Sequence, residues 1–119
     1  RELAILAVAR ALDSRYEWHQ HVGLGQDVGL EIATIRAIGR KDHETLSASD
    51  RVLAAYAIAA ARGAVDDAVF QAAGERLDDA ALVGVALLAA YYVMTERFAA
   101  ALSIPIEDAF VGWEPSAPE

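Results

Sequence analysis

The residues best suited to chemistry are a glutamate and a histidine four positions apart, Glu17 and His21. On a helix this spacing places both side chains on one face, within reach of each other. A carboxylate beside an imidazole holds the ring in one tautomer and favours its protonated form, and partial burial of the pair would suit general acid–base catalysis. Ser14 lies on the same face one turn earlier, with Tyr16 beside it. A structural role fits the same pattern, because Ser14 and Glu17 have the spacing of a capping box and Glu17 and His21 that of an exposed ion pair.

The remaining histidines are weaker candidates for chemistry. His19 and His21 resemble a metal-binding pair, but residues two apart on a helix point about 200° away from each other, so they cannot hold one ion together. His43 falls in a charged loop, where a solvated side chain is expected. The chain has no cysteine, which removes disulfides, thiolate metal sites and thiol nucleophiles. We therefore expect no metal site.

The elements that must position these residues are helices. Hydrophobic residues make up 55% of the 119 residues, alanine is abundant, and only 3 prolines and 8 glycines interrupt the chain. Alanine is the strongest helix former, and the length is that of one domain. We therefore expect a single all-α domain over residues 1–119, a bundle of about six helices, whose start at Arg1 indicates a truncated N-terminal edge. The expected helices cover Glu2–Leu12, Arg15–Asp27, Glu31–Ile38, Ser47 or Ser49 to Ala61, Asp66 or Asp67 to Arg76, and Asp78 to Ala101.

The charge balance limits the partners. The chain has 10 Lys and Arg against 18 Asp and Glu, a formal charge of −8, so its surface repels nucleic acid, and it has no basic cluster for an anionic membrane. The uncharged run Ala80–Met94 is shorter than the about 20 residues of a membrane span, and it predicts a helix buried in the core or in a subunit interface. The high apolar content favours a homo-oligomer. The absence of cysteine and of a signal peptide favours a cytoplasmic location.

Several segments resemble the carboxymuconolactone decarboxylase-like family, which includes alkylhydroperoxidase D. The resembling segments are Arg1–Leu6, Tyr16–Val22, Gly29–Leu30 and Leu82–Leu102. The resemblance covers nearly the whole chain, and its most specific part is the Glu-Trp-x-x-His motif from Glu17 to His21. It implies an alkylhydroperoxidase D-like bundle that assembles as a dimer, trimer or hexamer.

The peroxidase branch of this family carries a Cys-x-x-Cys motif four residues before a histidine, with a glutamate one helix upstream. The resemblance places that histidine at His21 and the upstream glutamate at Glu2, whereas the two cysteine positions hold Ser14 and Glu17, and Tyr16 stands at a histidine position between them. A serine and a glutamate cannot form the disulfide, so we do not expect thiol hydroperoxidase activity.

The decarboxylase branch fits the remaining residues better. Its members act without a cofactor on carboxylated γ-lactones, where loss of carbon dioxide leaves a carbanion that a positioned acid must protonate. The resemblance implies His21 as the acid, Glu17 as its orienting or relay group, and Glu2 as a second relay carboxylate. The residues expected to contact substrate are Ser14, Arg15 and Tyr16.

Two functions from different classes follow. The first is a lyase-type enzyme, acting by acid–base chemistry on a small organic acid or lactone. The alternative is a non-catalytic small-molecule-binding or assembly protein that has kept the fold and lost the chemistry. The enzyme requires that Glu2, Glu17 and His21 meet in a sheltered position, whereas the alternative predicts that they are capped or solvated and lie apart.

Overall fold

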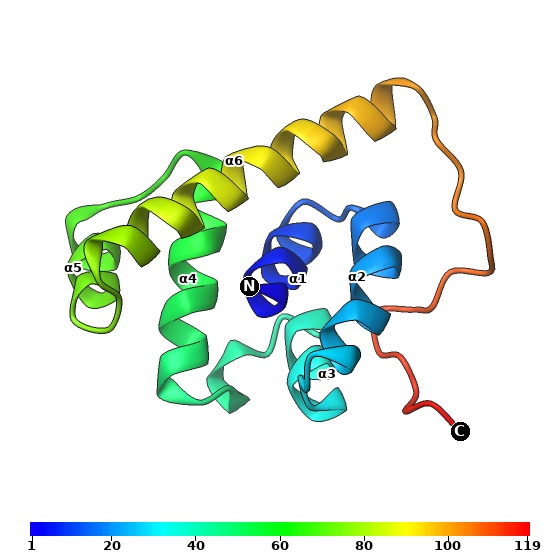
Figure 1. Ribbon diagram of the computed structural model, residues 1–119, viewed down its shortest axis with the longest axis horizontal. Coiled ribbons are helices and arrows are strands. Elements are labelled where there is room, and N and C mark those ends of the chain that lie inside the picture. Colours follow the sequence, from blue (N-terminus) through cyan, green and yellow to red (C-terminus); the bar gives the residue numbers. More distant parts are fainter.

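The computed structural model describes all 119 residues and contains six α-helices, one short 3-10 helix and no strand (Figure 1). The all-α class predicted from composition is therefore confirmed. The elements are α1 (Glu2–Ala11), α2 (Arg15–Asp27), α3 (Ile32–Gly39), η1 (His43–Thr45), α4 (Ala48–Arg62), α5 (Asp67–Gly74) and α6 (Asp79–Ala101).

Side-chain caps set the start of four helices, as the sequence indicated. The side chains of Ser14, Ser47, Asp66 and Asp78 each accept a hydrogen bond from a backbone N–H three residues later, at the start of α2, α4, α5 and α6. Gly63 ends α4 in the left-handed conformation, with φ of 64°. Two predictions were wrong in detail: α5 ends two residues before Arg76, and the segment predicted as loop before α4 contains η1. A three-residue helix carries no periodic signal, which explains the second difference.

The centre of the molecule is α1. Every residue from Glu2 to Ala9 is buried, and the helix packs against α2, α3, α4 and α6 (Figure 1). On one side of α1 the main core cluster includes Leu6, Ile35 and the fully buried Trp18. Burial of side chains of this size contributes about 1.5–3 kcal/mol each, so these contacts fix α1 firmly against α2 and α3.

The C-terminal segment is irregular and is held against the core by Phe110 and Trp113. The indole N–H of Trp18 donates to the carbonyl of Gly112 at 2.8 Å, and the Trp18 and Trp113 rings lie 5.4 Å apart. The contact is close enough to require a glycine at position 39, where an added Cβ would lie 1.7 Å from the Trp113 carbonyl oxygen. The end of the chain therefore covers the face of α2 and α3 that would otherwise expose Trp18.

The longest helix, α6, lies along one side of the body. Only Leu82, Ala89, Tyr92 and Ala99 of this helix are buried. The sequence-based alternative of a helix buried in the core is therefore wrong for this chain, because one face of α6 packs on α1 and α4 and the other faces outward. By length and composition alone α6 could cross a membrane, but a single helix of this kind is weak evidence for a membrane span. The compact body with this one weakly apolar helix is consistent with a soluble protein.

Candidate functional site

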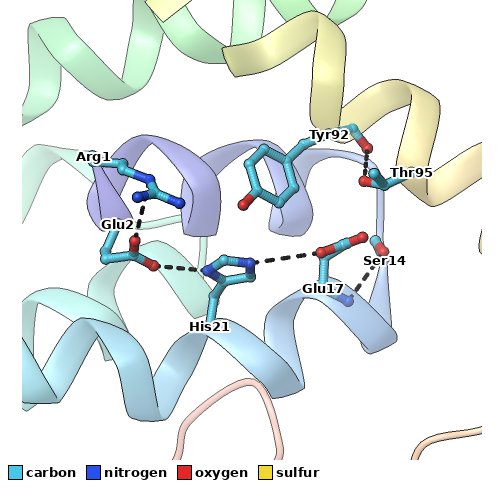
Figure 2. Close-up of polar contacts among 7 residues, drawn as sticks. All are labelled: Arg1, Glu2, Ser14, Glu17, His21, Tyr92 and Thr95. Carbon is cyan, nitrogen blue, oxygen red and sulfur yellow. Dashed lines mark hydrogen bonds and ion pairs between the residues drawn. The ribbon is translucent and has the colours of Figure 1, made fainter.

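A histidine lies between two glutamates where α1 and α2 pack together. His21 Nδ1 is 2.7 Å from Glu2 Oε2, and His21 Nε2 is 3.7 Å from Glu17 Oε2 (Figure 2). The three residues are buried, with exposed fractions of 8% for His21, 8% for Glu2 and 7% for Glu17. Ionisable residues are rarely buried to this extent unless they are paired, so this cluster is the unusual feature of an otherwise alanine-rich core.

The helices explain how the three side chains meet. Glu2 is in the first turn of α1, whose following residues are all buried and cannot rotate about the helix axis without exposing core. Glu17 and His21 are four residues apart on α2, so they share one face. Ser14 Oγ accepts the Glu17 backbone N–H at 3.5 Å, which holds the start of α2 and the position of Glu17. The capping role considered from the sequence is thus present together with the cluster.

The contact with Glu2 determines which nitrogen of the ring carries a proton. An ionised carboxylate only accepts hydrogen bonds, so Nδ1 must be the donor to Glu2. The opposite nitrogen, Nε2, is beyond direct hydrogen-bond distance of Glu17 at 3.7 Å. Nε2 is therefore the nitrogen available to exchange a proton with a bound molecule, while Glu2 fixes the orientation of the ring.

Tyr92 of α6 completes the cluster from the other side. Its ring meets the His21 ring edge-on, with centroids 5.1 Å apart and an angle of 87°. Figure 2 shows the ring extending from α6 over the imidazole, between Arg1 and Glu17. Burial raises the pKa of the Tyr92 hydroxyl, and the charges of the nearby Glu17 and Glu2 raise it further. The hydrogen bond from Arg1 and the positive charge of Arg1 lower this pKa, but burial is the largest effect and the pKa is raised overall. The hydroxyl thus stays protonated at neutral pH and can donate a hydrogen bond.

Sequence reasoning missed Tyr92 as a site residue. The only signal in the sequence was a tyrosine within an apolar helix. The spacing of four residues that pairs Glu17 with His21 relates positions on one helix only, so it could not connect Tyr92 of α6 to His21 of α2. Arg1 is the cation of the cluster, with its Nε 3.7 Å from Glu2 Oε1 and a side chain that is 74% exposed.

The three residues expected to contact substrate are placed differently from one another. Ser14 is buried beside Glu17, Tyr16 is half-buried, and Arg15 is exposed with its guanidinium 4.5 Å from the centre of the Phe110 ring. All three line a pocket of about 240 Å³ between α2 and the C-terminal half of α6. The structure does not bring Arg15 to the imidazole, because adjacent positions on a helix differ by about 100° in direction. The histidine cluster itself reaches solvent only through a narrow edge, where its side chains are 9–10% exposed.

The other two histidines lie outside the cluster. His19 Nδ1 accepts the backbone N–H of Val111 at 3.0 Å, so this side chain faces the C-terminal segment and not His21. His43 is in η1, where burial lowers its pKa more than the neighbouring Asp42 and Glu44 raise it. No three His, Asp or Glu side chains are arranged to hold a metal ion.

No family model matches the chain, and no curated protein or solved structure matches it significantly. The geometry around His21 therefore carries the functional argument.

Proposed function

We propose that the protein is a cofactor-independent enzyme of the carboxymuconolactone decarboxylase-like type, a cytoplasmic alkylhydroperoxidase D-like bundle that performs acid–base chemistry on a small organic acid or lactone. The observation that supports this most strongly is the buried imidazole held at Nδ1 by Glu2, 2.7 Å away, with its other nitrogen free. General acids and bases need this combination of fixed orientation, partial shielding from water and a free proton-exchanging atom.

The proposed reaction is a decarboxylation followed by protonation. The bond between the carboxylate and its carbon breaks, carbon dioxide leaves, and the electron pair stays on the carbon, delocalised into the conjugated lactone. His21 delivers the proton on Nε2 to that carbon and becomes neutral, with Nδ1–H still bound to Glu2. Glu17, whose Oε2 is 3.7 Å from Nε2, then passes a proton taken from solvent to Nε2 when its side chain moves within hydrogen-bond distance.

Tyr92 and the adjacent pocket have supporting roles in this proposal. The Tyr92 hydroxyl, kept protonated by its raised pKa, donates a hydrogen bond to the oxygen that becomes negative as the carbanion forms. An acidic chain with formal charge −8 can bind a carboxylate only where a cation is close. Arg1 lies at the Glu2 end of the cluster, and we assign the substrate's carboxylate to it. Arg15 and Tyr16 line the pocket at the start of α2, at the Glu17 end, and we assign the substrate's other polar groups to them.

The test is turnover by the full chain on a panel of carboxylated γ-lactones and keto acids, with the release of carbon dioxide as the measured quantity. With the substrate so identified, we expect His21→Gln to lower kcat by about 10²–10⁴-fold, the usual contribution of a positioned acid or base. His19→Gln is the matched control, because His19 lies on the same helix, faces Val111 and should leave kcat unchanged. Equal turnover by the wild-type protein and His21→Gln would show that the site is assigned to the wrong residue.

The alternative proposal is a non-catalytic binding or assembly protein that retains this fold. The specific observation in its favour is the narrow access to the cluster, whose side chains are only 9–10% exposed. It predicts that members of the panel raise Tm without being converted. A thiol hydroperoxidase remains disfavoured, because its chemistry needs cysteines that the chain lacks.

A further inference from the structure

The outer face of α6 is an exposed apolar surface that the single chain leaves uncovered. Its large side chains are 55–66% exposed, and they are Val83, Leu87, Tyr91, Met94, Phe98 and Leu102. At 100° per residue they fall within an arc of about 100°, so they form one continuous stripe along the helix. We call these residues the α6 stripe. Figure 1 shows α6 crossing one edge of the molecule, with no other element on the outer side of its C-terminal half.

A pocket of about 440 Å³ lies beside the N-terminal half of this stripe. Its walls are apolar side chains of α4, α5 and α6, including Tyr56, Phe70 and Leu82, and its one charged residue is Asp79. At the other end of the stripe, Phe98 is 61% exposed, and the neighbouring Arg97 has a side chain that is 76% exposed. One protomer therefore presents an apolar pocket with a carboxylate at one end of α6 and an exposed aromatic ring with a guanidinium at the other.

We propose that the α6 stripe is the interface with a second copy of this chain, arranged antiparallel about a two-fold axis. An axis near the middle of α6 sets Leu87 opposite the second copy's Tyr91, and Val83 opposite its Met94. The same register brings Phe98 to the apolar pocket of the second copy and Arg97 to the pocket's carboxylate, Asp79. A two-fold axis repeats each contact, so one surface satisfies both protomers.

The size of the surface suits this occupant. Six large side chains, each more than half exposed, present on the order of 600 Å² of apolar area, close to the roughly 800 Å² that each partner contributes to a stable interface. Ala80 and Gly84 are exposed on the same face, and a Cβ at Gly84 would meet nothing within 4 Å. Small residues among large ones allow two helices to approach closely and interdigitate.

A lipid surface fits the same face less well. The uncharged run of α6 is bracketed by Asp78 and Asp79 on one side and Glu96 and Arg97 on the other. The inner face of the helix packs on α1 and α4, and the protein carries a net charge of −8.

The interface adjoins the histidine cluster. Tyr91, in the middle of the stripe, packs edge-on against Tyr92 with centroids 5.2 Å apart, and Tyr92 packs against His21. Packing of the second copy against Tyr91 would therefore fix the position of Tyr92, which covers the histidine cluster from the α6 side.

Sedimentation velocity on the full chain tests the interface. We expect the wild-type protein to sediment as a dimer of the 12.7 kDa chain at micromolar concentration, and Leu87→Glu to sediment as a monomer with unchanged helical circular dichroism. Val28→Glu is the matched control, because Val28 is 70% exposed but lies at the end of α2, away from the stripe, and should remain dimeric. A monomeric wild-type protein, or self-association that Leu87→Glu does not change, would overturn the proposal.

A charge exchange tests the antiparallel register. In homodimers, Asp79→Arg and Arg97→Asp each place like charges opposite each other, and we expect either variant to raise the dimer dissociation constant at least about tenfold. An equimolar mixture of the two variants restores opposite charges at both contacts, so we expect it to form a heterodimer. Failure of the mixture to associate would refute this register. Co-sedimentation of the wild-type protein with phosphatidylcholine vesicles, in place of dimerisation, would identify the stripe as a lipid-binding surface and overturn the interface.

Discussion

Replacing Glu2 by glutamine tests whether one hydrogen bond sets the state of the imidazole. In the wild-type protein the ionised carboxylate accepts from His21 Nδ1 at 2.7 Å, which leaves Nε2 free. A glutamine amide can instead donate its NH₂ to Nδ1 and thereby move the ring proton to Nε2. We expect the neutral ring to change from the Nδ1–H tautomer to the Nε2–H tautomer in Glu2→Gln.

The magnitude follows from the type of bond that is lost. A buried hydrogen bond to a charged group contributes about 1.5–3 kcal/mol and a neutral one about 1 kcal/mol, so Glu2→Gln should lower the free energy of unfolding by about 1–2 kcal/mol. For a chain of this length, that loss corresponds to a decrease in Tm of roughly 5 °C. Because the carboxylate orients the ring, kcat should fall by about 10²-fold or more even though His21 is still present.

Nitrogen NMR of the imidazole reports the tautomer directly, and it needs no substrate. A thermal melt gives the stability change, and turnover on the substrate identified by the panel gives the catalytic change. Glu31→Gln is the control, because it makes the same chemical change at an exposed residue that forms no side-chain cap. If the tautomer, the Tm and kcat of Glu2→Gln all match those of Glu31→Gln, the Glu2–His21 contact does not have the role assigned to it.

Four further predictions concern pH and packing. Burial raises the pKa of Tyr92, so the folded protein keeps this proton after the unfolded chain has lost it near pH 10. The free energy of unfolding should therefore decrease as pH rises from there through the folded pKa. Tyr92→Phe should show a smaller decrease in Tm over the same alkaline range. Burial lowers the pKa of His43, so the unfolded chain takes up its proton first as pH falls below about 6.5. The free energy of unfolding should therefore decrease in this range, and His43→Gln should show a smaller decrease in Tm between about pH 7 and pH 5. Gly39→Ala should displace the C-terminal segment and cost about 3 kcal/mol or more in chemical denaturation, because the new Cβ would lie 1.7 Å from the Trp113 carbonyl oxygen. Gly23→Ala, in the exposed interior of α2 with nothing within 4 Å, should instead stabilise the protein by about 0.5–1 kcal/mol.

The local elements of the fold could be predicted because their signals are local. Ser14, Asp66 and Asp78 cap helices in the structure through hydrogen bonds to N–H groups three residues later. The predicted bounds of α2 match the structure at both ends. Glu17 and His21 face each other across one turn of α2, which follows from their spacing alone.

The arrangement between helices was not accessible from spacing. Glu2 was proposed from a family resemblance, since a residue on α1 has no periodic relation to one on α2. The position of Tyr92 depends on how α6 crosses α2, which is decided by packing of the whole bundle. Arg15 is next to the motif in sequence, yet it stacks on Phe110 of the C-terminal segment. Each of these outcomes depends on contacts between residues far apart in the chain.

The contrast between α1 and α6 explains why an apolar pattern alone does not locate the core. Both helices are apolar on most sides, but α1 is buried from Glu2 to Ala9 whereas α6 exposes its stripe. At 1.5 Å per residue, the 10 residues of α1 span about 15 Å and fit inside a body whose extents are 40 × 33 × 21 Å. The 23 residues of α6 span about 34 Å, most of the body's 40 Å length, so the other elements of a 119-residue chain cannot enclose this helix. The apolar surplus seen in the composition therefore collects on the one helix that is too long to bury, which is why we propose a second copy of the same helix, equal in length and chemistry, as its cover.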